Sequence, residues 1–454
     1  MLKLFQKPIR VIAIDFGSNA IRVLIGEQNK EGSIAILGYG TSPTESAISK
    51  GIIQDIDATR QALHHAISMA YQKNNKVPPK LISIGINTPR AETQTKEGVV
   101  RLKNEEITEE HMYQAFDMAQ RELNKHEKEL ITSVTSYEWY IDNIGVSQPL
   151  GMKANQLKIR LHATLIPKVI IENIRNCIES VLTPTHSVID HFIYSPIATA
   201  LGSLTPEEFE LGALIIDLGK TTTNMAVFSE HKLLYASTFD FGTIFLTRDV
   251  TALLKVTFDE ANKLIYDYGI SSELINNPNI ASPAVSELKN ISGSTLSLSS
   301  ERKNNPVHLQ SALDGFSRNI PKMELEGVIF ARAQEMVHTL KQEIDIKKLE
   351  NTFIGGVVLA GGGAQLKNFD ILVKKCFNTP VRIARPLGIQ NIPQSINNSE
   401  FATVVGILKH GFTQYNAIQK GTVFQHKRIA NQFFHFLTSP KKLFTSKKKR
   451  TNAS

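Results

Sequence analysis

The stretch LGALIIDLGKTTTNMAVF, residues 211–228, decides the fold class of this chain. It predicts a buried strand that ends at Asp217, a tight turn that contains Gly219, and a second strand. The stretch VIAIDFGSNAIRVLIGE, residues 11–27, has the same plan, with Asp15 closing its first strand and a glycine in its turn. Two such strand–turn–strand units, far apart in one chain, predict a duplicated α/β domain.

Each of the two turns can bind an anion. The glycine lets the backbone turn sharply, so that N–H groups and hydroxyls point at one spot. Two facing turns could hold the phosphate tail of a nucleotide from both sides, and Asp15 and Asp217 could hold Mg²⁺ through its waters. A third glycine turn, Gly361–Gly363, follows the predicted buried strand Val357–Ala360 and could lie flat against an adenine ring. The alternative is that each turn is an ordinary hairpin, but three together favour a nucleotide site.

Length and composition set wider limits. At roughly 100–200 residues per domain, 454 residues predict two to four domains. With two cysteines, Cys177 and Cys376, the chain has no disulfide framework, which indicates a reducing compartment. We expect no secretory signal at the N-terminus and no membrane-spanning helix, since no sufficiently long apolar window occurs.

All of the net charge lies in the C-terminal tail. The chain has 51 basic and 43 acidic residues, and eight of the basic residues lie beyond residue 420, where there is no acid. On a helical wheel, Ile429–Leu437 has an uninterrupted apolar arc opposite a polar one, and Pro440 ends the helix. A basic amphipathic helix is typical of proteins that bind an anionic membrane surface. The predicted membrane-binding residues are Arg428, Ile429, Phe433, Phe434, Phe436, Leu437, Lys441 and Lys442. The alternatives are a helix docked on the chain's own core and, less favoured, nucleic-acid binding; we expect no nucleic-acid partner.

Apolar periodicity and capping residues predict the helices. They are expected over 57–71, 108–125, 168–181, 257–268, 324–344, 366–376 and 401–409. Asp57 and Thr108 are the predicted N-caps of the first two. The inward face predicted for the helix over 168–181 consists of Val169, Ile170, Ile174, Cys177 and Val181. Residues 282–319, rich in Ser, Asn and Pro, predict a loop-rich stretch or an irregular hairpin.

The three glycine turns resemble the phosphate-1, phosphate-2 and adenosine motifs of the actin and Hsp70 ATPase superfamily. Tyr194–Ala200 and Phe401–Gly406 are similar to its two connecting hinge helices. Within the superfamily the chain resembles the bacterial cell-division family FtsA, from about residue 9 to 412. The segments that carry this narrower resemblance are Lys50–Asp57, Glu105–Glu110, Pro149–Met152 and Ala384–Pro386.

The resemblance implies an actin-like two-lobe α/β fold, with duplicated ribonuclease-H-like domains and an inserted FtsA-type subdomain 1C. The expected divisions are subdomain 1A in three parts (1–82, 167–200 and 387–412), 1C (83–166), 2A in two parts (201–255 and 323–386), 2B (256–322), a linker (413–427) and the membrane-targeting tail (428–454).

The resemblance also implies ATP and Mg²⁺ as cofactors. The expected nucleotide-binding residues are Asp15, Gly17, Ser18, Asn19, Asp217, Gly219, Lys220, Thr221, Thr222, Gly242, Asn262, Gly361, Gly362 and Gly363, with Asp15 and Asp217 holding the metal through water. The second loop departs from the family, since Lys220 and Thr221 stand at usual glycine positions and Asn224 replaces an acid. Asn262 and Ile265 stand where relatives place a Glu and a Lys to hold the ribose. We therefore expect ATP binding with weak or no hydrolysis, and Lys220 could either pair with a phosphate or crowd the loop.

By resemblance, the chain is a peripheral protein on the cytoplasmic side of the cell membrane at the division site. The implied partners are the tubulin-like protein FtsZ, which it would tether to the membrane, other divisome proteins, anionic phospholipid, and further copies of itself in protofilaments. Two alternatives stay open. One is a PilM-like scaffold of pilus assembly, which shares the fold but needs no lipid helix. The other, less favoured, is an exopolyphosphatase-like phosphohydrolase, whose first loop is similar to Asp15–Asn19.

Overall fold

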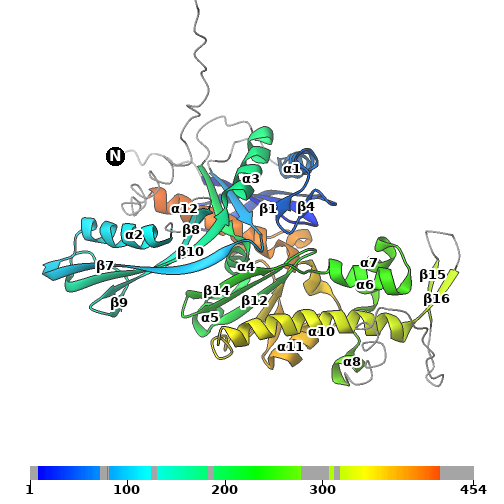
Figure 1. The fold of residues 1–454 in the computed structure, drawn as a ribbon. Coiled ribbons are helices and arrows are strands. Elements are labelled where there is room, and N and C mark those ends of the chain that lie inside the picture. The colour runs from blue at the N-terminus through cyan, green and yellow to red at the C-terminus, as the bar shows by residue number, and fades with distance from the viewer. Residues whose placement is uncertain are drawn as a thin grey trace, which may run out of the picture. The chain divides into compact units, whose positions relative to one another are not determined.

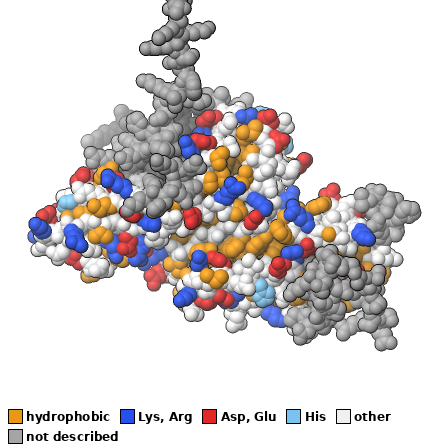
Figure 2. Space-filling view, viewed as in Figure 1, with side chains coloured by type: hydrophobic (Ala, Val, Ile, Leu, Met, Phe, Trp, Pro, Cys, Tyr) orange, Lys and Arg blue, Asp and Glu red, His pale blue; other side chains and the backbone are white. Residues whose placement is uncertain are grey.

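The computed structural model describes residues 9–71, 79, 81–123, 130–182, 189–277, 306–310 and 317–419 (Figure 1). The chain divides into two compact units. The first comprises Met1–Thr95, Leu123–Tyr137 and His162–Phe412, and the second Lys96–Glu122, Glu138–Leu161 and Thr413–Ser454. On the face shown in Figure 2, basic and acidic side chains are interspersed, as expected for a stretch from residue 1 to 420 that is neutral overall.

The first unit contains a six-stranded sheet with the order β11-β6-β1-β2-β3-β19. Its strands are β1 (Ile9–Phe16), β2 (Ala20–Gln28), β3 (Ile34–Pro43), β6 (Leu81–Ile86), β11 (Ile189–Tyr194) and β19 (Ile389–Gln390). Strand β1 pairs antiparallel with β2 and parallel with β6. One face is covered by α1 (Ile56–Tyr71) and α3 (Lys168–Val181). On the other face, α12 (Ala402–Gln419) places Leu408 against Gly26 and Ile407 against Gly85. Burial on both faces explains why β1, β2 and β6 are nearly continuous apolar runs.

A second sheet in the same unit repeats this plan, with five strands in the order β14-β13-β12-β17-β18. They are β12 (Ala213–Leu218), β13 (Thr223–Ser229), β14 (Lys232–Phe239), β17 (Val357–Ala360) and β18 (Val381–Ile383). Here β12 pairs antiparallel with β13 and parallel with β17, as β1 does with β2 and β6. The predicted duplication of the α/β domain is therefore confirmed.

The short helix α8 (Ser272–Asn276) adds Leu274 and Ile275 to the core of the second sheet, and four longer helices supply much of the rest. They are α6 (Ile244–Leu254), α7 (Phe258–Tyr268), α10 (Lys322–Ile346) and α11 (Phe369–Phe377). The shorter elements of the unit are β4 (Ile48–Ser49), β5 (Ile52–Ile53), α4 (Ser195–Ser203), α5 (Pro206–Leu211), α8 (Ser272–Asn276) and the 3-10 turns η2 (Gly362–Gln365), η3 (Gln394–Ile396) and η4 (Ser399–Phe401). Within the predicted irregular stretch 282–319, the described residues form the strands β15 (Pro306–Gln310) and β16 (Ser317–Pro321), which pair antiparallel.

Three details of the predicted helices are wrong. The helix predicted over 401–409 is too short, because α12 extends to Gln419. Helix α1 is capped by Asp55, not by Asp57: the Asp55 carboxylate accepts hydrogen bonds from the backbone N–H groups of Asp57 and Ala58, at 2.9 and 3.0 Å. An N-cap must lie outside the first turn to reach these N–H groups. In α3, Val169 is 57% exposed, and Ile171 and Ile178 are buried in its place. The buried residues instead follow the spacing 170, 171, 174, 177 and 178, which is one face of a regular helix.

The second unit holds most of a four-stranded sheet and one helix. The sheet has the order β7-β10-β8-β9, with β7 (Glu92–Glu106), β8 (Leu130–Ile141), β9 (Ile144–Val146) and β10 (Lys153–Pro167). Helix α2 (Glu109–Leu123) lies directly on β7, since a Cβ at Gly98 would be 1.8 Å from the Ala115 carbonyl oxygen. Thr108 caps α2 as predicted, accepting a hydrogen bond from the His111 N–H at 3.4 Å. Strand β7 was not predicted, because charged residues alternate with the few buried ones along it.

Among the described residues, no helix is both long enough and apolar enough to cross a membrane.

Candidate functional site

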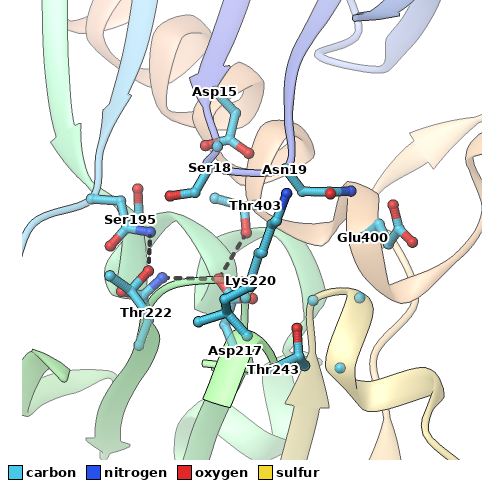
Figure 3. A pocket seen from close by; sticks show the side chains of 18 of the residues that line it. Asp15, Ser18, Asn19, Ser195, Asp217, Lys220, Thr222, Thr243, Glu400 and Thr403 are labelled. Carbon is cyan, nitrogen blue, oxygen red and sulfur yellow. Dashed lines mark hydrogen bonds between the residues drawn. The ribbon is translucent and has the colours of Figure 1, made fainter. Parts of the chain in front are cut away.

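A cavity of about 370 Å³ lies where the two glycine-containing hairpins meet, within the first unit (Figure 3). The hairpin β1–β2 supplies Asp15, Gly17, Ser18, Asn19 and Arg22, and the hairpin β12–β13 supplies Asp217, Gly219, Lys220, Thr222 and Asn224. The remaining lining residues are Asn87, Ser195, Thr243, Ile244, Thr247, Asn262, Tyr266, Gly361, Gly362, Gly363, Glu400 and Thr403. Twelve of the fourteen predicted nucleotide-binding residues thus line one cavity, and Thr221 and Gly242 do not.

The two acids hold equivalent positions in the two sheets. Asp15 pairs across its hairpin with Arg22, and Asp217 pairs with Asn224. Each acid is the penultimate residue of its strand. The duplicated topology therefore brings the two carboxylates to the same cavity from opposite sides. The residues facing them across the hairpins differ, one being a guanidinium and the other a neutral amide.

Asp217 is buried and its Oδ2 atom is heavily hydrogen-bonded. It accepts from the Asn224 side-chain amide at 3.0 Å and from the hydroxyls of Thr199 and Thr403, each at 3.3 Å. Burial raises the pKa of Asp217, and these three hydrogen bonds together with the charge of Arg22 oppose that rise. The other carboxylate oxygen, Oδ1, lies against Gly361. Asp217 therefore links Asn224, Thr199 and Thr403 through hydrogen bonds, in addition to lining the cavity.

Asp15 is in a different position. It is only 8% exposed, yet among the described residues no group donates a hydrogen bond to its carboxylate. Burial raises the pKa of Asp15 to about 6; the nearby Arg22 charge lowers it and Asp217 raises it. Its oxygens therefore remain available to a ligand, a metal-bound water or a proton.

The two hairpin turns touch each other. The Thr221 hydroxyl donates to the Ser18 hydroxyl at 2.6 Å and accepts from the Lys50 N–H at 3.0 Å. The Asn87 side-chain amide donates to the Thr222 hydroxyl at 2.9 Å. Thr221 is thus engaged in the contact between the two turns and does not line the cavity.

Three glycines are needed for packing in and around the second hairpin. A Cβ at Gly242 would be 2.6 Å from the Lys220 carbonyl, so this glycine supports the turn from behind. Gly361 has a φ of +81°, and a Cβ there would be 2.4 Å from Asp217 Oδ1. A Cβ at Gly363 would meet the Leu218 side chain at 2.3 Å. Close approach of the backbone to the second hairpin therefore requires these glycines, whatever the ligand.

Several lining residues were missed in the sequence. Arg22 donates a hydrogen bond to Glu400, and its guanidinium lies over the Phe401 ring at 5.6 Å from the ring centroid. An arginine within the apolar run of β2 is the signal that could have indicated a functional position. Asn262 was predicted at the ribose position. The Thr247 hydroxyl donates a hydrogen bond to its side-chain oxygen at 2.7 Å, so Thr247 positions the Asn262 amide.

The predicted membrane-binding residues lie outside the described residues. They are Arg428, Ile429, Phe433, Phe434, Phe436, Leu437, Lys441 and Lys442. Helix α12 continues to Gln419, so the first part of the predicted linker 413–427 is helical.

Solved structures share the architecture of this chain. The PilM-PilN type IV pilus biogenesis complex matches 88% of this chain and 98% of that chain, with a TM-score of 0.58 and 10% identity. MreB5 of Spiroplasma citri bound to ADP matches 90% and 98%, with a TM-score of 0.50 and 13% identity. At such identities the likeness shows the fold alone. With the family model of the inserted domain described next, it confirms the predicted actin-like fold and its insertion.

Sequence comparison gives the family. The model of the cell division protein FtsA matches residues 214–406, and that of the SHS2 domain inserted in FtsA matches residues 90–165. The cell division protein FtsA of Neisseria meningitidis serogroup B is 24% identical over 406 residues, covering 89% of this chain and 90% of that protein. The FtsA of Buchnera aphidicola subsp. Schizaphis graminum is 26% identical over 415 residues, covering 88% and 90%. The chain belongs to the FtsA family of cell-division proteins.

Proposed function

We propose that this cell-division protein binds ATP with Mg²⁺ in the cavity between its two hairpins, and that it tethers FtsZ filaments to the cytoplasmic face of the membrane. The observation that carries nucleotide binding is the convergence of two equivalent acid-and-glycine hairpins and a glycine turn on one cavity of about 370 Å³. Turn N–H groups with hydroxyls on both sides suit a phosphate tail. The MreB5 structure with bound ADP supports this assignment by analogy of fold.

The residues present fit a magnesium ion held through its waters. Asp15 offers carboxylate oxygens that take no hydrogen bond within the described part of the chain, and Mg²⁺ keeps several waters when it binds phosphates. Asp217 can contribute only through Oδ1, because Oδ2 already accepts from three donors. When bound, the metal would neutralise charge on the phosphates.

Hydrolysis should be weak or absent. The carboxylates that line the cavity are Asp15, Asp217 and Glu400 among the described residues. Glu400 is bonded by Arg22 and Gln365, and Asp217 by its own donors. At position 224 an amide donates to Asp217, where an acid could have oriented a water. If Asp15 holds the waters of the metal ion, neither Asp217 nor Glu400 is free to act as a general base.

Calorimetric titration with Mg-ATP tests the site. Asp217→Ala should abolish binding, and Asp15→Asn should weaken it without leaving buried donors unpaired. Asp240→Ala is the matched control, since Asp240 pairs with Lys50 outside the cavity lining and should bind like wild type. Wild-type affinity in both cavity variants, with circular dichroism showing a folded protein, would make the assignment wrong.

Membrane attachment rests on the sequence of the tail. Its eight basic residues without an acid are each worth roughly 1 kcal/mol near an anionic leaflet, and its apolar arc adds burial that salt does not screen. A Phe433→Glu, Phe436→Glu double variant should lose binding to anionic liposomes. Its control is Asn431→Glu with Gln432→Glu, which adds the same charge on the polar arc and should retain much more binding. Equal flotation of the two double variants would remove the tail as anchor. Unfolding of the first would instead favour a helix docked on the core.

The partner proposals follow from family membership. We expect FtsZ to bind through the predicted subdomain 2B (256–322), self-association to need the predicted subdomain 1C (83–166), and the chain to work at the division site with other divisome proteins. We propose the other predicted domain limits on the same ground of family membership. Co-pelleting with liposomes and FtsZ, with and without ATP, tests the tether: FtsZ should pellet only when the chain and its tail are both present.

Two alternatives have direct tests. A PilM-like scaffold is weaker than the FtsA assignment, since its support is a similarity of fold at 10% identity. Failure of the isolated tail to float with lipid would favour it. Release of phosphate from polyphosphate would favour the exopolyphosphatase alternative.

A further inference from the structure

Lys220 is a cation that lines the cavity without a partner. Its side chain extends from the second hairpin turn toward the first (Figure 3), and within the described residues its ammonium makes no hydrogen bond or ion pair. The neighbouring cations form ion pairs: Lys50 pairs with Asp240 at 2.8 Å, and Arg22 pairs with Glu400. A lone ammonium in a cavity between two anion-binding turns indicates a place for an anion.

The backbone of Lys220 is fixed, so its side chain cannot leave by a swing of the loop. Its carbonyl oxygen accepts a hydrogen bond from the Ile244 N–H at 2.9 Å, and that of Gly219 accepts from the Thr243 N–H at 3.0 Å. Gly242 packs closely against both of these carbonyl groups. Only the flexible four-carbon stem of Lys220 can adjust to a ligand.

The second hairpin has little negative charge left to hold a metal. Three donors already use Oδ2 of Asp217, and Oδ1 lies against Gly361. Asn224, which faces Asp217 across the hairpin, carries no charge. This side of the cavity therefore combines one cation on an anchored backbone with one hydrogen-bonded carboxylate, which suits a phosphate better than a metal ion.

We propose that the Lys220 ammonium neutralises the phosphate tail of the bound nucleotide in place of much of the metal's charge, so that the site holds ATP with little dependence on Mg²⁺. This rests on the nucleotide binding proposed above. A lysine ammonium is a compact charge with three donors and binds phosphate oxygens as a point charge. In a cavity partly screened from water, such a charge acts more strongly than at an open surface.

The test is titration of the full chain with ATP, in excess Mg²⁺ and in excess EDTA. The wild-type Kd should change by less than about threefold between the two solutions, since the Lys220 ammonium remains in both. Lys220→Gln, which keeps the length and loses the charge, should bind about tenfold or more weakly in EDTA, as expected for one charged hydrogen bond. Mg²⁺ should restore much of that loss. Lys220→Arg should behave like wild type, and Lys232→Gln, which removes a cation outside the cavity lining, should change neither titration.

Each other outcome separates the two proposals. Wild-type binding that is tight in Mg²⁺ and lost in EDTA would overturn the role of Lys220 and leave nucleotide binding intact. Tighter binding by Lys220→Gln in EDTA would show that the side chain crowds the loop, and would also overturn it. No ATP binding by the wild type in either solution would overturn the nucleotide site itself.

Discussion

The hydroxyl groups of Thr199 and Thr403 lie 2.9 Å apart, and both contact the same oxygen of Asp217 at 3.3 Å. Thr199 belongs to α4 and Thr403 to α12, the two helices predicted as hinges from their resemblance. Where these helices cross, a Cβ at Gly406 would be 1.6 Å from the Ala198 carbonyl oxygen, so their backbones touch. The crossing is thereby hydrogen-bonded to the acid of the second hairpin, and any relative movement of the helices must disturb that acid.

Thr403→Val should destabilise the protein. Valine has nearly the same shape but cannot donate to the buried Asp217 carboxylate, and loss of such a bond costs about 1–3 kcal/mol. Chemical denaturation should show this decrease in the free energy of unfolding. Thr339→Val, on the exposed face of α10, is the control and should change it by about 0.5 kcal/mol or less. Equal effects would mean that the contact to Asp217 adds no stability.

Gly406→Ala should destabilise by about 2 kcal/mol or more, because the two helices must separate to admit a methyl group. Without the crossing, the same substitution would stabilise the helix, because alanine is favoured over glycine by about 1 kcal/mol. A loss of stability would therefore indicate the close contact between the helices. Gly411→Ala on the same helix is the comparison. Its Cβ would meet a Val11 methyl group at 2.7 Å, and a side chain can move more easily than a backbone. In thermal unfolding, Gly406→Ala should have a lower midpoint temperature than Gly411→Ala. The reverse order would contradict the close crossing of the helices.

Gly361→Ala and Gly388→Ala compare two glycines with positive φ angles, +81° and +75°. Each variant carries a conformational cost of at least about 1 kcal/mol, and the ψ of 176° at Gly361 adds to the cost there, because only glycine readily adopts that region. At Gly361 the new methyl group would also overlap Asp217 Oδ1 at 2.4 Å, whereas at Gly388 the nearest atom is the flexible Lys409 Nζ at 3.3 Å. Gly361→Ala should therefore be the less stable variant and should lose Mg-ATP binding. Binding that survives in Gly361→Ala would show that the Asp217 position is not critical.

The raised pKa of Asp15 makes a prediction for the nucleotide-free protein in EDTA. Because the folded pKa of about 6 exceeds the unfolded value of 3.8, the folded state binds the proton more tightly, and this group makes stability fall as pH rises between those values. Asp15→Asn removes the buried charge, so it should stabilise by at most about 3 kcal/mol at pH 7.5 and by about half of that at pH 5. Denaturation of both proteins across this range measures the difference. A gain that grows toward low pH would contradict the assignment.

The sequence by itself determined the parts of the molecule that depend on local pattern. The buried runs before Asp15 and Asp217, each followed by a glycine turn, predicted both hairpins and the duplication, because a strand buried on both faces must be continuously apolar. The run Val357–Ala360 and the glycines after it were predicted with the same bounds that the structure gives. The segregation of charge into the tail is likewise a property of sequence alone.

The tertiary structure alone decided which side chains meet. Arg22 and Glu400 are 378 residues apart, and Thr221 and Ser18 are 203 apart, so no local pattern links them. The predicted set included Thr221 as a ligand, but the contact between the two hairpin turns uses its hydroxyl. Asp217 was expected to face a metal, yet packing of α4 and α12 brings two threonine hydroxyls to it. Local sequence specifies burial and turns, whereas the partner of a polar group depends on how distant elements pack, and that packing leaves Asp15 and Lys220 open to the cavity while it engages Asp217.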